Sequence, residues 1–169
     1  MKLYAAPVPF VRGQHETAGF ECGSESLDIW LQRYAGQSQS RDAARTFVVV
    51  DSARVVGYYA LVVAEIDIGE ASSDVARGMS TRFPIPVVKL ARLAVDRKSQ
   101  RTGLGGGLLL DALERSVRAS EDVGIRAVVV DAIDQSAESF YKKHGFEASE
   151  LEDDVLMIRL RDVREMLAR

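Results

Sequence analysis

The sequence has few of the residues that build disulfides, metal centres or membrane spans. Its 169 residues include one cysteine, Cys22, which excludes an internal disulfide and a cysteine-based zinc site. Its two histidines, His15 and His144, lack the spacing of a metal-ligand pair. No stretch is apolar over the roughly 18 residues that a membrane span needs, and residues 1–7 lack the apolar core of a secretory signal. We therefore expect a cytoplasmic protein with no membrane association and no bound metal.

The sequence also lacks a large excess of either charge, since 22 basic and 25 acidic side chains leave a net charge of −3. This balance does not favour direct DNA binding by this chain alone. Residues 61–101 nevertheless carry seven basic and five acidic side chains, whereas residues 102–169 carry nine and fourteen. A basic middle on an acidic body suits a ligand that bears phosphate, and ordinary solvated charges explain the pattern equally well.

The overall composition predicts an ordinary globular protein, with 47% hydrophobic and 28% charged residues. At this length we expect a single domain over residues 1–169. Residue patterns predict an edge strand or irregular lead-in within 1–13 and strands at 45–51, 55–64, 87–95, 125–130, 146–148 and 155–160. They predict helices at 24–35, 38–44, 103–123 and 134–145 and from Asp162 onward. The order β–α–α–β–β–β–α–β–α–β–β indicates an α/β fold, with a mixed twisted sheet of about six to seven strands flanked by helices on both faces.

Local signals set several of these boundaries. Gly36 is expected to end the first helix, and Asp162 to cap the last one. Asp134 is expected to cap the helix that ends at Gly145. Residues 67–86 are rich in glycine, serine and proline, which predicts a long loop with a short helical piece near residues 73–78.

The most informative stretch runs from the apolar strand at 87–95 into a glycine-rich loop and a helix. The loop reads Gln100-Arg101-Thr102-Gly103-Leu104-Gly105-Gly106-Gly107. The first N–H groups of a helix have no partner inside it, and the helix dipole adds partial positive charge there. Glycines let a bulky anion approach these groups closely. The stretch therefore predicts a pyrophosphate site, with a glycine-rich helix start without a ligand as the alternative.

These residues resemble the GNAT superfamily of N-acetyltransferases. Residues 100–105 match its Q/R-x-x-G-x-G/A signature, Leu93-Ala94-Val95 resembles its pantetheine-contacting strand, and residues 140–146, FYKKHGF, resemble its F-Y-E-K-x-G-F segment. The resemblance covers nearly the whole chain, and it implies the GNAT fold and acetyl-CoA as cofactor. The cofactor-binding residues that it implies are Leu93, Ala94, Val95, Gln100, Arg101, Thr102, Gly103, Leu104, Gly105, Gly106 and Tyr141.

The chain is also similar to the GNAT-type toxins of bacterial type II toxin–antitoxin systems, in residues 20–23, 27–31, 44–48, 57–61 and 86–95. That resemblance implies acetylation of the α-amino group of aminoacyl-tRNA, which blocks translation. It also implies a homodimer and a small ribbon-helix-helix antitoxin as partner. Three alternatives stay open: a GNAT enzyme acting on a small-molecule amine or a protein N-terminus, a catalytically inactive GNAT fold serving as a binding module, and an unrelated phosphate-binding α/β protein.

Acetyl transfer to an amine requires a proton for the leaving thiolate. In the family, the tyrosine that matches Tyr141 sits near the cofactor sulfur, and a phenol with a pKa of about 10 is protonated at neutral pH. Tyr141 is therefore the candidate catalytic residue, with a packing tyrosine as the alternative. Glu65 and Asp67 are candidate bases, although a solvated strand end is the favoured interpretation of both. Many family members have Asn at the position of Asp134, whose carboxylate cannot donate to a pantetheine carbonyl.

Basic side chains in and near the central strand are the candidate tRNA contacts. Arg92 lies within that strand, where an arginine is rarely buried without a partner. It is therefore expected either to contact tRNA phosphate or to form a structural ion pair. The further candidates are Lys89, Arg77, Arg82 and Arg45.

Overall fold

The computed structural model describes residues 2–169, and the chain divides into two compact units. The first unit comprises Met1–Val62 and Ala91–Ala112, and the second comprises Val63–Leu90 and Leu113–Arg169. Strands β3 (Arg54–Ile66) and β4 (Ile85–Val95) and helix α4 (Leu104–Ala119) each contribute residues to both units. The assignment of residues 1–169 to one domain stays a prediction.

The strands form one mixed sheet of seven strands, in the order β1-β2-β3-β4-β5-β7-β6. Parallel pairing joins β4 to β5, from Val87↔Ala127 to Leu90↔Val130. The pairs β1–β2, β2–β3, β5–β7 and β6–β7 are antiparallel. The presence of both kinds of pair confirms the predicted mixed sheet. The parallel pair requires a crossover connection, which passes through α4. The remaining strands are β1 (Val8–Pro9), β2 (Arg45–Asp51), β5 (Ala127–Asp131), β6 (Glu147–Ala148) and β7 (Val155–Arg159).

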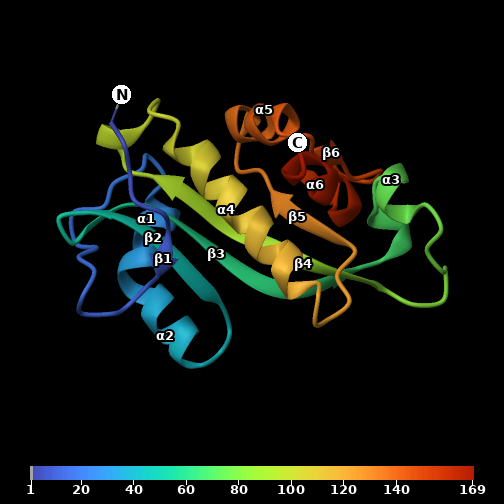
Figure 1. Cartoon of the computed structure of the whole chain (residues 1–169), viewed down its shortest axis with the longest axis horizontal. Coiled ribbons are helices and arrows are strands. Elements are labelled where there is room, and N and C mark those ends of the chain that lie inside the picture. Colours follow the sequence, from blue (N-terminus) through green and yellow to red (C-terminus); the bar gives the residue numbers. More distant parts are fainter. Residues whose placement is uncertain (1) are drawn as a thin grey trace. The chain divides into compact units, whose positions relative to one another are not determined.

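In the first unit, a run of helix lies beside β1 and β2 (Figure 1). It consists of α1 (Glu25–Ile29), the π-helical turn η1 (Trp30–Tyr34) and α2 (Ala35–Ser40). The prediction that Gly36 ends the first helix is therefore wrong. A Cβ atom at Gly36 would lie 2.9 Å from Cδ of Arg12, so this glycine makes room for a neighbouring side chain. The core beneath the helices includes Phe20, Trp30, Leu31, Val48 and Tyr58.

In the second unit, the residues predicted as a long loop contain two short helices, η2 (Ile68–Glu70) and α3 (Ser73–Ala76). The Ser72 hydroxyl caps α3 by accepting a hydrogen bond from the Val75 N–H at 3.4 Å. The predicted helical piece is thus confirmed. This segment is packed rather than free, since Ala71 and Val75 share a core with Ile85, Val129 and Met157.

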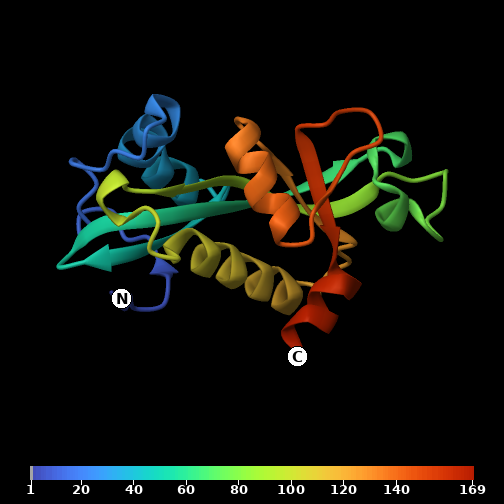
Figure 2. The ribbon, with the colours of Figure 1, turned by 90° about the horizontal axis from the view of Figure 1, so that it is seen from above.

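Helices α5 (Gln135–Lys143) and α6 (Leu160–Leu167) complete the second unit. Figure 2 shows α5 and the C-terminal end of α4 on opposite sides of β4 and β5, as expected for a sheet with helices on both faces. Asp134 caps α5 as predicted, because its Oδ1 accepts from the Ala137 N–H at 2.8 Å. The prediction that Asp162 caps the last helix is wrong. Asp162 lies inside the first turn of α6 and pairs with Arg159 at 2.9 Å.

The helices are short, and α4 has 16 residues. None of the helices in residues 2–169 has both the length and the apolar character to cross a bilayer. The same residues contain no group of three or more His, Cys, Asp or Glu side chains placed to hold a metal ion.

Candidate active site

The glycine-rich loop joins the end of β4 to the start of α4 within the first unit. A short 3-10 turn, η3 (Arg97–Ser99), follows β4, and α4 begins at Leu104. Two loop residues have a left-handed backbone, Arg101 with φ 63° and Gly103 with φ 88°. Glycine adopts this conformation freely, whereas an arginine adopts it at a cost that the surrounding contacts must offset. The loop can therefore turn sharply into the helix.

Side-chain hydrogen bonds hold the loop in this shape. Nε2 of Gln100 donates to the Cys22 carbonyl at 2.8 Å and to the Val95 carbonyl at 2.9 Å. Both hydrogens of this amide nitrogen are thus engaged within the protein, so the side chain of Gln100 supports the loop. The Thr102 hydroxyl donates to the Ser99 carbonyl at 2.5 Å.

Asp96, directly after β4, is a supporting residue that the sequence reasoning missed. Its side chain is buried, and its two oxygens accept from the N–H groups of Lys98 and Glu21, both at 3.1 Å. The carboxylate thereby ties the turn after β4 to the segment before α1. A signal was available, because an aspartate directly before a short polar turn is a typical capping residue.

The start of α4 leaves backbone donors without helical partners. The first bond of the helix runs from the Gly107 N–H to the Gly103 carbonyl at 3.1 Å, so the N–H groups of residues 104–106 have no acceptor inside the helix. A Cβ atom at Gly103 would meet nothing within 4 Å, which shows open space beside the loop. At Gly57 of β3, a Cβ atom would lie 3.0 Å from Leu108, so glycine here lets the helix approach the sheet. Open space and unpartnered donors suit a pyrophosphate.

The predicted pantetheine-contacting strand, Leu93–Val95, is the end of β4 and lies in the same unit as the loop. Ala94 is buried in the core of that unit, whereas Leu93 and Val95 are half-buried. The first residues of β4 that pair with β5 are better shielded, since Val87, Val88 and Leu90 are buried. The structure thus brings together the predicted phosphate and pantetheine contacts, and it leaves the end of the strand partly accessible.

Tyr141, the candidate proton donor, lies on α5 in the second unit and is 5% exposed. Its ring packs against Phe140 and Phe146, with ring centroids 5.1 and 5.4 Å apart. Burial raises the pKa of the Tyr141 phenol, because a low-dielectric surrounding disfavours the charged form. The phenol is therefore protonated at neutral pH. The chain reverses after the helix at Gly145, where φ is 93°.

Of the two candidate bases, Asp67 follows the hairpin strand as expected, and Glu65 does not. Glu65 does not follow the hairpin strand but lies inside β3, which continues to Ile66. Asp67 precedes η2, and the Glu70 carboxylate accepts from its N–H at 3.3 Å in a capping box. Asp67 therefore has a structural role at a helix start, and neither residue is assigned as a base.

Arg92 forms no ion pair within residues 2–169, so the structural ion pair expected as one alternative is absent. Its guanidinium carbon lies instead 4.4 Å from the ring centroid of Trp30. Trp30 in turn stacks on Tyr58, with centroids 6.0 Å apart and planes 12° from parallel. Burial lowers the pKa of the Arg92 guanidinium. The guanidinium is half-buried against this aromatic stack, and no carboxylate of residues 2–169 forms an ion pair with it.

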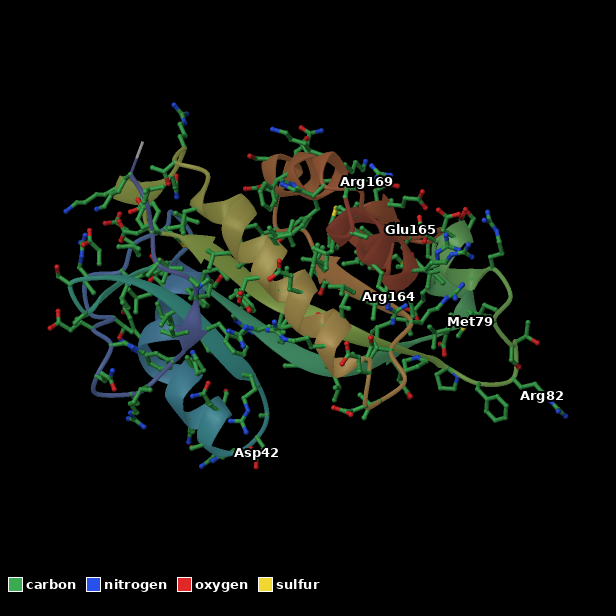
Figure 3. The ribbon with its side chains drawn as sticks, viewed as in Figure 1. Asp42, Met79, Arg82, Arg164, Glu165 and Arg169 are labelled. Atoms are coloured by element: carbon green, nitrogen blue, oxygen red, sulfur yellow. The ribbon has the colours of Figure 1, made fainter. Side chains whose placement is uncertain are left out.

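The other basic candidates differ in whether a carboxylate neutralises them. Three are paired: Arg45 with Asp42 at 2.8 Å, Arg77 with Asp74 at 3.1 Å and Lys89 with Asp131 at 2.7 Å. Arg82 makes no ion pair in the described part of the chain, and Figure 3 shows it pointing away from the exposed loop before β4. Arg45 and Arg92 belong to the first unit, whereas Lys89, Arg77 and Arg82 belong to the second.

Known proteins are similar to this chain in sequence and in fold. Over 167 residues it is 37% identical to a Mycobacterium tuberculosis protein described as "tRNA-acetylating toxin", and the match covers 99% of each chain. A solved structure of AtaTR bound with AcCoA has a TM-score of 0.82 and 26% identity, covering 96% of this chain and 97% of that chain. AtaT complexed with acetyl-methionyl-tRNAfMet has a TM-score of 0.86 and 24% identity, covering 96% and 98%, and it shows the same fold.

A comparison with protein families finds a match over most of the chain. A model described as an acetyltransferase (GNAT) domain matches residues 25–162. This range includes the end of β4, the loop, α4 and α5. The matched range therefore contains the residues predicted to bind the cofactor and the candidate catalytic residue, Tyr141. The chain therefore belongs to the GNAT acetyltransferase family.

Proposed function

We propose that this protein is an acetyl-CoA-dependent N-acetyltransferase that acetylates the α-amino group of aminoacyl-tRNA and thereby blocks translation. The observation that carries the proposal is the full-length likeness, at 37% identity, to a tRNA-acetylating toxin. The open start of α4 supports the cofactor half of the proposal, because it offers unpartnered N–H groups beside open space.

The residues of the loop fit a cofactor that carries a pyrophosphate. Acetyl-CoA supplies the acetyl thioester, and the N–H groups of residues 104–106 bind its phosphates. The exposed guanidinium of Arg101 adds a positive charge beside them, and Gln100 supports the loop. The proposed cofactor contacts are Leu93, Ala94, Val95, Arg101, Thr102, Gly103, Leu104, Gly105, Gly106 and Tyr141.

Tyr141 is proposed to donate its phenolic proton to the leaving thiolate. A phenol carries its proton at neutral pH even at its ordinary pKa of about 10, and burial keeps the pKa of Tyr141 from falling below that value, so the proton is present to be donated. The acceptor needs no dedicated base, because the amine of an aminoacyl ester has a lower pKa than a lysine side chain and is partly neutral. A water molecule is sufficient to take its proton.

Arg92 is the foremost candidate for contact with tRNA phosphate. It is a half-buried cation without a carboxylate partner, and an external anion would complete its environment. Arg82 is second, because its charge is also unpaired in the described chain. Arg45, Arg77 and Lys89 contribute less, since each already has an acidic partner.

The proposal includes the partners of a toxin. We infer that the protein acts in the cytoplasm as a homodimer and is neutralised by a ribbon-helix-helix antitoxin. Support comes from the description of the Mycobacterium tuberculosis relative as a toxin and from the five stretches of sequence that resemble such toxins.

The test incubates the protein with radiolabelled acetyl-CoA and charged total tRNA. Uncharged tRNA, a polyamine and a peptide with a free N-terminus are separate acceptors. The expected result is label on charged tRNA alone, released with the amino acid when alkali cleaves the ester. Label on the polyamine or the peptide alone would show the second function, acetylation of a small amine or a protein N-terminus. Absence of label on every acceptor would overturn the enzyme assignment.

A further inference from the structure

A cavity of about 280 Å³ lies beside the glycine loop, within the first unit. One wall is the N-terminal segment, residues 2–7, and the other is the loop and the first turns of α4. The cavity includes Thr102, Gly103 and Leu104, which also belong to the proposed phosphate site. The two sites therefore adjoin each other.

Contacts between side chains hold the N-terminal segment beside the loop. The side chains of Ser99 and Thr102 lie beside the Tyr4 phenol, and their polar groups lower its pKa. Lys2 forms an ion pair with Asp51, and its ammonium lies 5.6 Å from the ring centroid of Tyr4. The segment thus lies against the turn before the loop and is joined to the end of β2 by an ion pair.

The lining of the cavity is mostly apolar and carries no negative charge. Apart from Lys2, Tyr4 and Thr102, its side chains are apolar or absent, and no aspartate or glutamate contributes. Pockets for whole drug-sized ligands measure about 300–1,000 Å³, so this cavity suits one part of a larger ligand. Its aromatic wall and the absence of acidic groups favour a flat heterocycle attached to an anion.

We propose that this cavity receives the adenine base of acetyl-CoA, with residues 2–7 as one of its walls. The inference rests on the proposed function, which supplies the cofactor. In coenzyme A the adenosine is joined directly to the pyrophosphate, so the base lies next to the groups that hold the phosphates. Tyr4 brings an aromatic ring to the cavity, and Leu3 and Leu104 bring apolar side chains to it.

A glycine of α4 allows the cavity to be filled without disturbing the fold. Gly107 lines the cavity, and a Cβ atom there would meet nothing within 4 Å. Leucine is a better helix former than glycine, so Gly107→Leu is expected to fold at least as stably as the unchanged protein. Gly69→Leu is the matched control, because Gly69 also has open space but lies outside this cavity.

The experiment measures, by titration calorimetry, binding of acetyl-CoA and of acetyl-phosphopantetheine, which lacks the adenosine. The unchanged protein is expected to prefer acetyl-CoA. Gly107→Leu should weaken acetyl-CoA binding about tenfold and leave acetyl-phosphopantetheine binding unchanged. Tyr4→Ala should shift the preference in the same direction, and Gly69→Leu should change neither affinity.

Two outcomes separate this inference from the proposed function. If the unchanged protein binds acetyl-CoA but Gly107→Leu and Tyr4→Ala keep its full preference for it, the cavity does not hold the base, while the acetyltransferase proposal stands. The same conclusion follows if the unchanged protein binds both ligands equally. If the unchanged protein binds no acetyl-CoA, the proposed function fails and the inference fails with it.

Discussion

The glycine loop and the five basic candidates are both proposed to contact phosphate, and they do so with different kinds of donor. At the loop, the donors are backbone N–H groups at the start of α4. The side chains of Gln100 and Asp96 stabilise the conformation of the loop through hydrogen bonds to the backbone. Among the basic residues, the donors are side chains, and three of the five are occupied by carboxylates. A backbone site needs only the local turn and helix, whereas a side-chain site depends on which acids lie nearby.

This difference predicts how each region responds to mutation. A change in the backbone conformation of the loop is expected to have a large effect, because it removes several donors together. A change in one basic side chain is expected to have a smaller effect, and its size should depend on whether that side chain has an acidic partner.

The largest expected effect is that of Gly103→Asp. The substitution places a carboxylate beside the free N–H groups of α4 and strains a residue whose φ is 88°. We expect acetyl-CoA affinity to fall roughly a hundredfold or more by calorimetry, because the charge and the strain act together. Gly78→Asp is the control, since Gly78 has φ 78° and equally open space but lies in the other unit. Normal affinity in the Gly103 variant would show that the loop is not the phosphate site.

Tyr141→Phe tests the chemistry separately from the loop. Turnover should fall roughly a hundredfold or more, because the proton donor is lost, while acetyl-CoA binding stays unchanged. Tyr34→Phe, at an exposed tyrosine, is the control. Since burial raises the pKa of Tyr141, its proton is retained beyond the ordinary tyrosine pKa of about 10. The rate should therefore show no loss from phenol ionisation up to about pH 10, and unchanged turnover in the variant would remove Tyr141 from the reaction.

Arg92→Ala tests the side-chain half of the comparison. It should weaken binding of charged tRNA roughly fivefold and lower the salt slope by about one, whereas Arg77→Ala should change both less because Arg77 is paired with Asp74. Arg92→Met preserves an apolar contact with Trp30 and removes only the charge. Filter binding at several salt concentrations measures the three variants. Wild-type affinity in the methionine variant would mean that Arg92 contributes packing alone.

The smallest expected effect is that of Gln100→Ala. The variant loses two hydrogen bonds that hold the loop, so the free energy of unfolding should fall by about 1–2 kcal/mol. Acetyl-CoA affinity should fall only a few-fold, since the backbone donors of α4 are still present. Urea denaturation and calorimetry measure the two quantities, with Gln14→Ala at an exposed glutamine as control. A loss of affinity as large as that of Gly103→Asp would show that Gln100 contacts the cofactor directly.

The predictions that proved right depend on residues close together in the sequence. The apolar run of β5 predicted a buried parallel strand, and Asp134 predicted the cap of α5. The predictions that proved wrong ignored a distant or an earlier partner. The helix runs through Gly36, where the absent side chain leaves room for Arg12, and Asp162 lies within the first turn of α6, where it pairs with Arg159 at the end of β7.

The sequence by itself determined the order of the strands and helices, the left-handed turn of the loop and the free N–H groups at the start of α4. Each of these follows from backbone preferences over a few neighbouring residues. Only the tertiary structure decided which side chains are available. In the folded chain Gln100 donates a hydrogen bond to Cys22, 78 residues away, and the guanidinium of Arg92 lies over the ring of Trp30. Three basic candidates are paired with carboxylates, and residues 2–7 lie beside the loop. The physical reason is that a charge or a hydrogen-bond donor is free only if no partner lies within a few ångströms, and packing sets those distances.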